Sequence, residues 1–203
     1  MLADTATGRG AVNEISVVIP VREGGSPEIT LQSLGRQTFR DFNVVVSWDK
    51  AANANSARNR GAELATAPYL LFSDDDIQWE PDALEHLRNA LLTHADASYS
   101  YGAYAIGGWI QCHREFDAGR LRRANFISTM SLIRRETFPG FDESIERLQD
   151  WDLWLTMLER GSVGVYCGKT IFRTEKGHGI SYGSGAPPYD DAVAIVKRKH
   201  GLA

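Results

Sequence analysis

The chain has no long hydrophobic run, no excess of basic residues and few cysteines. None of its apolar runs approaches the ~20 residues that a membrane-spanning helix needs. The formal net charge of -4 argues against a nucleic-acid-binding protein, which would carry a basic surface. The two cysteines, Cys112 and Cys167, are far apart and form no Cys-x-x-Cys pair. We therefore expect a reduced, cytoplasmic protein with two inert thiols.

The first fourteen residues lack the apolar core of a signal peptide. We predict a flexible tail over residues 1–14 and one domain over residues 15–203, a length within the usual range for a single domain. Hydrophobic residues make up 43% of the chain and charged residues 24%, which is typical of a soluble globular protein.

Apolar strands alternate with amphipathic helices in the first half of the chain. Residues 15–20, 44–48 and 69–72 predict buried strands. Ser26 and Pro27 predict a helix start, and two further helices are expected over residues 55–65 and after Pro81. We expect the first helix to bury Leu31 and Leu34, the second to bury Ala57, Gly61, Leu64 and Ala65, and the third to bury Leu84, Leu87 and Leu91. This alternation predicts an α/β fold with a mostly parallel sheet flanked by helices.

The second half is less regular. We expect strands around residues 99–109, 126–134 and 163–167, a loop over 177–188 and a helix over 190–200. A helix beginning at Trp151 should bury Trp151, Trp154, Leu155 and Leu158, and leave Asp152, Thr156 and Glu159 on its solvated side.

Polar residues follow the three predicted strands of the first half. They are residues 21–23, Asp49 and the acidic run Asp74, Asp75 and Asp76. Ligands of parallel sheets bind beyond the carboxyl ends of the strands, so we expect these groups to converge on a site. Three neighbouring carboxylates repel one another, and a hard divalent cation would offset that repulsion. The alternative is a solvated acidic loop; an EF-hand is excluded because its glycine and distal glutamate are missing.

Several short motifs occur in a fixed order. They are residues 15–20 (ISVVIP), 31–39 (LQSLGRQTF), 56–61 (SARNRG), 71–76 (LFSDDD), 81–84 (PDAL), 134–136 (RRE), 140–143 (GFDE) and 149–155 (QDWDLWL). Each is weak alone, but the ordered set covers roughly residues 15–185 and resembles the family 2 glycosyltransferases, an inverting group with the GT-A fold. The resemblance implies a Rossmann-like GT-A sheet, with a nucleotide-binding half over 15–105 and an acceptor half over 106–203.

The resemblance also implies a set of site residues. The nucleotide of the donor would be held by Pro20, Val21, Arg22, Asp49, Arg58, Asp74 and Asp75. Asp76 would bind a divalent metal, Mn²⁺ or Mg²⁺, that bridges the diphosphate, and His178 from a late glycine-flanked loop would be a second metal ligand. Asp150 would be the catalytic base. The implied partners are a nucleotide-sugar donor, most commonly UDP-linked, and a carbohydrate, glycolipid or other hydroxyl acceptor.

Several alternatives stay open at this point. Arg58 could be a helix-surface charge, Asp150 an ordinary N-cap and His178 an exposed loop residue. The sequence departs from the family at Trp48-Asp49-Lys50, where paired aspartates and Gly-Ser are usual, and at Gln149, where glutamate is usual.

Two other functions would fit parts of the pattern: a sugar-phosphate nucleotidyltransferase and an inactive carbohydrate-binding relative. The arginines of the acceptor half, Arg114, Arg120, Arg122, Arg123, Arg134 and Arg135, favour a solvated face over a phosphorylated acceptor or a membrane.

Overall fold

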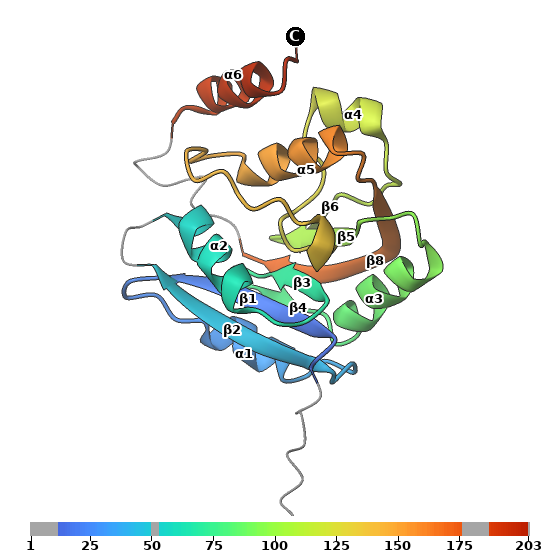
Figure 1. Ribbon diagram of the computed structural model, residues 1–203. Coiled ribbons are helices and arrows are strands. Elements are labelled where there is room, and N and C mark those ends of the chain that lie inside the picture. Colours follow the sequence, from blue (N-terminus) through green and yellow to red (C-terminus); the bar gives the residue numbers. More distant parts are fainter. Residues whose placement is uncertain (1–11, 50–52, 176–186, 203) are drawn as a thin grey trace, which may run out of the picture.

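The computed structural model describes residues 12–49, 53–175 and 187–202 (Figure 1). The first half contains β1 Ile15–Arg22, α1 Glu28–Leu34, β2 Phe42–Asp49, α2 Ala54–Leu64, β3 Tyr69–Phe72, β4 Gln78–Trp79 and α3 Ala83–Thr93. The second half contains β5 Tyr99–Ile106, β6 Trp109–Gln111, α4 Ala118–Arg123, β7 Leu132–Arg134, η1 Arg135–Thr137, α5 Gln149–Glu159, β8 Gly164–Thr174 and α6 Tyr189–Lys199. The predicted α/β class is confirmed.

The strands of the described residues form one eight-stranded sheet in the order β2-β1-β3-β7-β5-β8-β4, with β6 paired to β5. β1 lies parallel to both β2 and β3, as expected. β5 and β8 are also parallel, but β7 runs antiparallel to its neighbours β3 and β5. The sheet is therefore more mixed than the sequence indicated: its parallel pairs are β2-β1, β1-β3 and β5-β8, and the antiparallel β7 separates the first two pairs from the third.

Each face of the sheet has its own hydrophobic core. Val17 of β1 packs with Leu34 of α1 and Leu87 of α3 on one face. Val18, the next residue, points to the other face, where it packs in a cluster with Trp154 of α5 and residues of α2, α4 and α6. Figure 1 shows the corresponding layers, with α1 below the sheet and α4, α5 and α6 above it.

Gly61 allows α2 to lie very close to β1. A Cβ at this position would be 2.3 Å from Cγ1 of Val18, so any other side chain would push the helix away from the sheet. The glycine of the SARNRG motif thus fixes the height of α2 above the sheet, and with it the position of Arg58.

Some local predictions were wrong. Leu31 and Leu64 are exposed, because α1 turns Thr30, Ser33 and Leu34 inward and Leu64 is the last residue of α2. The strand expected over residues 126–134 is limited to β7. Side chains upstream of β7 bind nearby backbone N–H groups, which removes those donors from the sheet.

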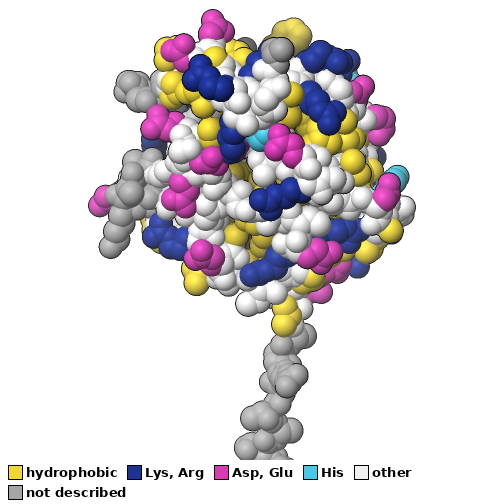
Figure 2. Space-filling view, turned by 45° about the horizontal axis from the view of Figure 1, so that its top comes forward, with side chains coloured by type: hydrophobic (Ala, Val, Ile, Leu, Met, Phe, Trp, Pro, Cys, Tyr) yellow, Lys and Arg dark blue, Asp and Glu magenta, His cyan; other side chains and the backbone are white. Residues whose placement is uncertain are grey.

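The surface of the upper face carries positive and negative side chains mixed together (Figure 2). No helix in the described part of the chain is long and apolar enough to cross a membrane. Residues 1–11 of the predicted tail lie outside the described residues, and the single domain over 15–203 remains a prediction.

Candidate functional site

The polar groups that follow β1, β2 and β3 converge, as expected from parallel strands. Arg22 at the end of β1 lies beside Asp49 at the end of β2, and Phe72 at the end of β3 pairs with Val18 of β1. The loop after β1 also reaches the loop after β3, because a Cβ at Gly25 would be 3.0 Å from Oδ2 of Asp75. The edge of the sheet therefore gathers these groups into one site.

Helix α1 holds the backbone of the acidic loop. The hydroxyl of Thr30 donates to the carbonyl of Asp74 at 2.9 Å and accepts from the N–H of Ile77 at 2.9 Å. The hydroxyl of Ser33 donates to the carbonyl of Ile77 at 3.2 Å. Both hydroxyls are buried, so residues 74–77 have a fixed course. Nothing in the sequence pattern had identified Thr30 or Ser33 as supports for this loop.

Arg58 joins α2 to the acidic loop. Its guanidinium donates to Oδ1 of Asp74 at 2.8 Å and to Oδ1 of Asn55 at 3.2 Å, and it lies 5.4 Å from the ring centre of Phe141. The Arg58 side chain is only 6% exposed, so the interpretation as a surface charge is wrong. Its Nε has no hydrogen-bond partner among the described residues.

The acidic loop concentrates negative charge. Burial raises the pKa of the Asp75 carboxyl above its usual range, and repulsion from Asp76 and Asp74 raises it further. The positive charge of Arg22 opposes this shift. Both neighbours therefore repel the charge of Asp75, and a cation bound here would be stabilised.

The donor set suits a metal that arrives with a diphosphate. Within the described ranges, no three His, Cys, Asp or Glu side chains form a preassembled metal site. Mg²⁺, however, is usually held by one or two carboxylates together with substrate phosphates, and carboxylate oxygens also suit Mn²⁺. Asp76 in this carboxylate-rich loop fits that requirement. His178, the other predicted ligand, lies outside the described residues.

Asp150 is the second residue of α5 and is half-buried. It is not the N-cap, a position taken by Leu148, so the N-cap interpretation is wrong. Burial raises the pKa of Asp150 to about 6. Two contacts oppose this rise: the N–H of Trp151 donates to Oδ1 of Asp150 at 2.8 Å, and Arg58 contributes a positive charge. A carboxylate with this pKa is ionised near neutrality and still able to accept a proton, as a general base requires.

The backbone around Asp150 is strained. Leu148 and Cys112 have φ angles of 63° and 64°, and they are the non-glycine residues with positive φ in the described part of the chain. Leu148 precedes α5 by one residue, and the Cys112 thiol is close enough for Asp150 to raise its pKa. Strained backbone is concentrated at functional sites, and here both strained residues border the same carboxylate.

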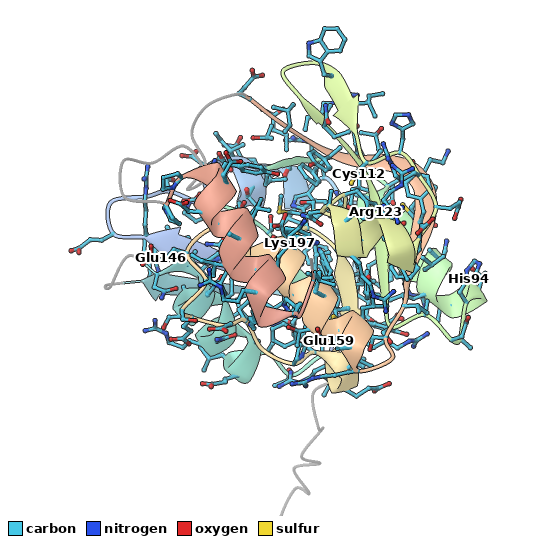
Figure 3. The ribbon with its side chains drawn as sticks, turned by 90° about the horizontal axis from the view of Figure 1, so that it is seen from above. His94, Cys112, Arg123, Glu146, Glu159 and Lys197 are labelled. Carbon is cyan, nitrogen blue, oxygen red and sulfur yellow. The ribbon has the colours of Figure 1, made fainter. Side chains whose placement is uncertain are left out.

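The prediction for Asp152 was wrong. Its side chain is buried and accepts from Lys199 at 2.7 Å and His200 at 2.9 Å, so it anchors the end of α6 to α5. Figure 3 shows α6 lying across α5, with Glu159 near the crossing. A cavity of about 420 Å³ lies between these helices and residues 139–142, and no residue of the acidic loop lines it. Charged groups that already pair with one another line much of it.

The remaining predicted nucleotide-binding residues lie on β1 and β2. The Val21 side chain is buried in the core, so only the main chain of this residue can contact a ligand. Pro20 is half-buried and Arg22 is exposed. Trp48 lies beside Val21 and is 52% exposed. The side chain of Asp49 lies outside the described part of the chain, and its role remains a prediction.

Comparison with known proteins gives a consistent result. Residues 32–139 match the model of the family described as glycosyl transferase family 2. The amylovoran biosynthesis glycosyltransferase AmsB of Erwinia amylovora is 31% identical over 99 residues, which covers 34% of this chain and 33% of AmsB.

Solved structures with the same fold include the S. aureus protein TarS. Its residues 1–349 in complex with UDP superpose with a TM-score of 0.69 at 16% identity, covering 91% of this chain and 63% of that one. The complex with UDP-GlcNAc gives a TM-score of 0.72 at 14% identity, covering 92% and 66%. The chain thus spans about a third of AmsB and less than two thirds of these TarS chains. The predicted GT-A type of fold is confirmed.

Proposed function

The chain belongs to glycosyl transferase family 2, and we propose that it transfers a sugar, with inversion, from a UDP-linked donor to an acceptor hydroxyl. The observation that best supports this proposal is the environment of the buried Arg58. This side chain forms an ion pair with Asp74 of the acidic loop, and its charge opposes the rise in the pKa of Asp150 that burial causes. One cation therefore acts on both the expected donor side and the expected base.

On the donor side, the nucleotide would lie across the ends of β1 and β2. Pro20, Val21 and Arg22 would contact the base and ribose, and Asp49 would accept a hydrogen bond from the base. Arg58, Asp74 and Asp75 would line the rest of the nucleotide pocket. Uridine is proposed because TarS, which has the same fold, was crystallised with UDP and with UDP-GlcNAc.

Asp76 would hold the divalent metal, with His178 as a further ligand. Mn²⁺ or Mg²⁺ bound there would stabilise the negative charge of the departing nucleoside diphosphate. The repulsion that Asp74 and Asp76 exert on Asp75 supports this assignment, because a cation would relieve it.

On the acceptor side, Asp150 would take the proton of the acceptor hydroxyl. The hydroxyl oxygen forms a bond to the anomeric carbon as the bond from that carbon to the diphosphate breaks, and attack from the opposite side inverts the configuration. The helix N-terminus favours the ionised carboxylate, whereas burial favours the protonated one. A pKa of about 6 is the balance of the two, and it suits a base that works near neutrality.

The acceptor is proposed only as a carbohydrate, a glycolipid or another hydroxyl compound. The retained Asp74, Asp76 and Asp150 argue against an inactive carbohydrate-binding relative, and the family match argues against a nucleotidyltransferase. The cytoplasmic location remains a prediction; both cysteines are free thiols, in agreement with a reducing environment.

A panel of nucleoside diphosphates, tested by thermal shift with and without Mn²⁺, would test the donor proposal. A ligand at 100 times its Kd stabilises the fold by about 2.7 kcal/mol. We expect UDP with Mn²⁺ to raise the melting temperature more than ADP, GDP or CDP. Equal shifts with all four, or none with any, would contradict it.

A further inference from the structure

The β5–β6 hairpin projects from the body of the molecule and ends in exposed apolar residues (Figure 3). Its turn consists of Gly107 and Gly108, with φ angles of 53° and 85°, and joins Ile106 to its partner Trp109. Positive φ at both central residues is the mark of a tight type I′ turn, so the tip is well defined.

Trp109 and Ile110 occupy the tip of this hairpin. They are 71% and 56% exposed, and Trp109 is the most exposed large hydrophobic residue in the described part of the chain. Consecutive strand residues point to opposite faces, yet both are uncovered, which means that neither face of the tip packs on the protein. The aromatic side chain of Trp109 and the branched aliphatic side chain of Ile110 are thus both exposed to solvent at the tip.

A positive segment follows the hairpin. Arg114, Arg120, Arg122 and Arg123 are exposed, and none forms an ion pair with a described carboxylate. Glu115 and Asp117 are the acidic residues between positions 107 and 124, so the stretch is net positive in a chain of net charge -4. Cys112 and Arg123 lie on the same side of the molecule in Figure 3.

This segment also borders the candidate base. Burial raises the pKa of the Cys112 thiol, and the charge of Asp150 raises it further; burial also raises the pKa of Asp150, and a hydrogen bond with the side chain of Asn125 opposes that rise. The exposed residues between Cys112 and Asn125 are therefore flanked at both ends by residues that lie near Asp150.

We infer that the surface formed by residues 107–111 and the four arginines, here the 107–123 surface, binds the headgroup region of an anionic lipid membrane. Trp109 and Ile110 enter the membrane–water interface. Indole rings are enriched there because they combine an apolar ring with a polar N–H group. The arginines meet the phosphates, each strengthening binding about fivefold near an anionic surface. A soluble polyanion would use the arginines but would leave the apolar tip unexplained.

This inference concerns binding and does not rest on the proposed function. If both hold, the acceptor hydroxyl reaches Asp150 from a lipid surface. Because the assay below measures partitioning and not transfer, its failure would leave the proposed activity intact.

The test is co-sedimentation of the full chain with vesicles of phosphatidylcholine alone or mixed with phosphatidylglycerol, at low and high salt. We expect binding to the mixed vesicles that weakens at high salt. The Arg122→Gln/Arg123→Gln variant should lose about thirtyfold in partitioning, and Trp109→Ser about tenfold or more. Leu31→Ser and Arg36→Gln, on the α1 side of the sheet, are matched controls and should bind like the wild type.

Three results would overturn the inference. The first is no binding of the wild type to mixed vesicles at low salt. The second is binding that survives Trp109→Ser and is removed by soluble polyphosphate, which would indicate a polyanionic partner. The third is a dimer in gel filtration that Trp109→Ser dissociates, which would make the tip an interface between two copies of the chain.

Discussion

The guanidinium of Arg58 donates to Oδ1 of Asp74 at 2.8 Å, and the two partners differ greatly in exposure: 6% for the Arg58 side chain and 41% for that of Asp74. The buried partner is therefore the one that depends on the pair. With Gly61 fixing α2 against β1, Arg58 holds one end of the acidic loop in place from the protein interior.

Asp74→Asn should destabilise the fold by about 1–3 kcal/mol, because it leaves the buried charge of Arg58 without its counter-charge. Urea denaturation would measure the loss. Asp75→Asn is the matched control on the neighbouring residue. Since burial and repulsion raise the pKa of Asp75, removing its charge should leave stability unchanged or increase it. Equal losses in the two variants would show that Arg58 does not depend on Asp74.

Asp150 should make stability depend on pH. Its folded-state pKa is raised from 3.8 to about 6, so the folded protein holds this proton more tightly than the unfolded chain. The resulting stabilisation is present below about pH 4 and lost as the pH rises through about 6. It amounts to on the order of 3 kcal/mol. Asp150→Asn should remove this decline in a series of urea titrations across that range; a decline that persists would assign it to another group.

Asp76→Ala should abolish the metal-dependent part of UDP binding while leaving the fold intact, because the carboxylate is replaced by a methyl group. Calorimetry with UDP, with and without Mn²⁺, would measure this directly. The expected result is that Mn²⁺ strengthens binding to the wild type and has no effect on the variant. An undiminished Mn²⁺ effect in Asp76→Ala would remove this residue from the metal site.

Lys199→Gln should loosen α6 from α5. The Lys199 ammonium donates to Asp142 and to the buried Asp152, each at 2.7 Å, and the bond to Asp142 lowers the pKa of that carboxyl to about 2. This contribution is present above about pH 4 and lost as the pH falls through about 2. After allowance for partial exposure, we expect a loss of about 1–2 kcal/mol at neutral pH.

Arg198→Gln removes the same charge from the neighbouring, exposed position of α6. It should change stability by less than about 0.5 kcal/mol. If it destabilises as much as Lys199→Gln, the effect is one of net charge and not of the contacts to Asp142 and Asp152.

The sequence predicted the first half of the fold well because its signals are local. The β-branched run at residues 15–20 and the stripe Leu84, Leu87 and Leu91 appear in the structure as β1 and the buried side of α3. β7 was harder to predict, because the antiparallel insertion between β3 and β5 depends on contacts far apart in the chain.

The sequence predicted the charged residues of the site but not the residues that hold them in place. Asp74, Asp75 and Asp76 stand out in the sequence, whereas the hydroxyl of Thr30 and the strained backbone at Cys112 have no sequence signature. Asp152 was assigned to the solvated side because periodicity along α5 cannot anticipate that α6 covers it.

The central claim is that Asp150 acts as the base of a transfer from a UDP-linked sugar. The most direct test is the release of UDP from UDP-GlcNAc, with which TarS was crystallised, by the wild type and by Asp150→Asn, each with Mn²⁺. Water can replace the acceptor in this assay, so slow hydrolysis suffices, and other UDP-sugars extend it. We predict that the wild-type rate rises with pH through about 6, and that Asp150→Asn binds UDP normally yet releases it at least ~10²-fold more slowly. A variant that turns over at a near-normal rate would contradict the account.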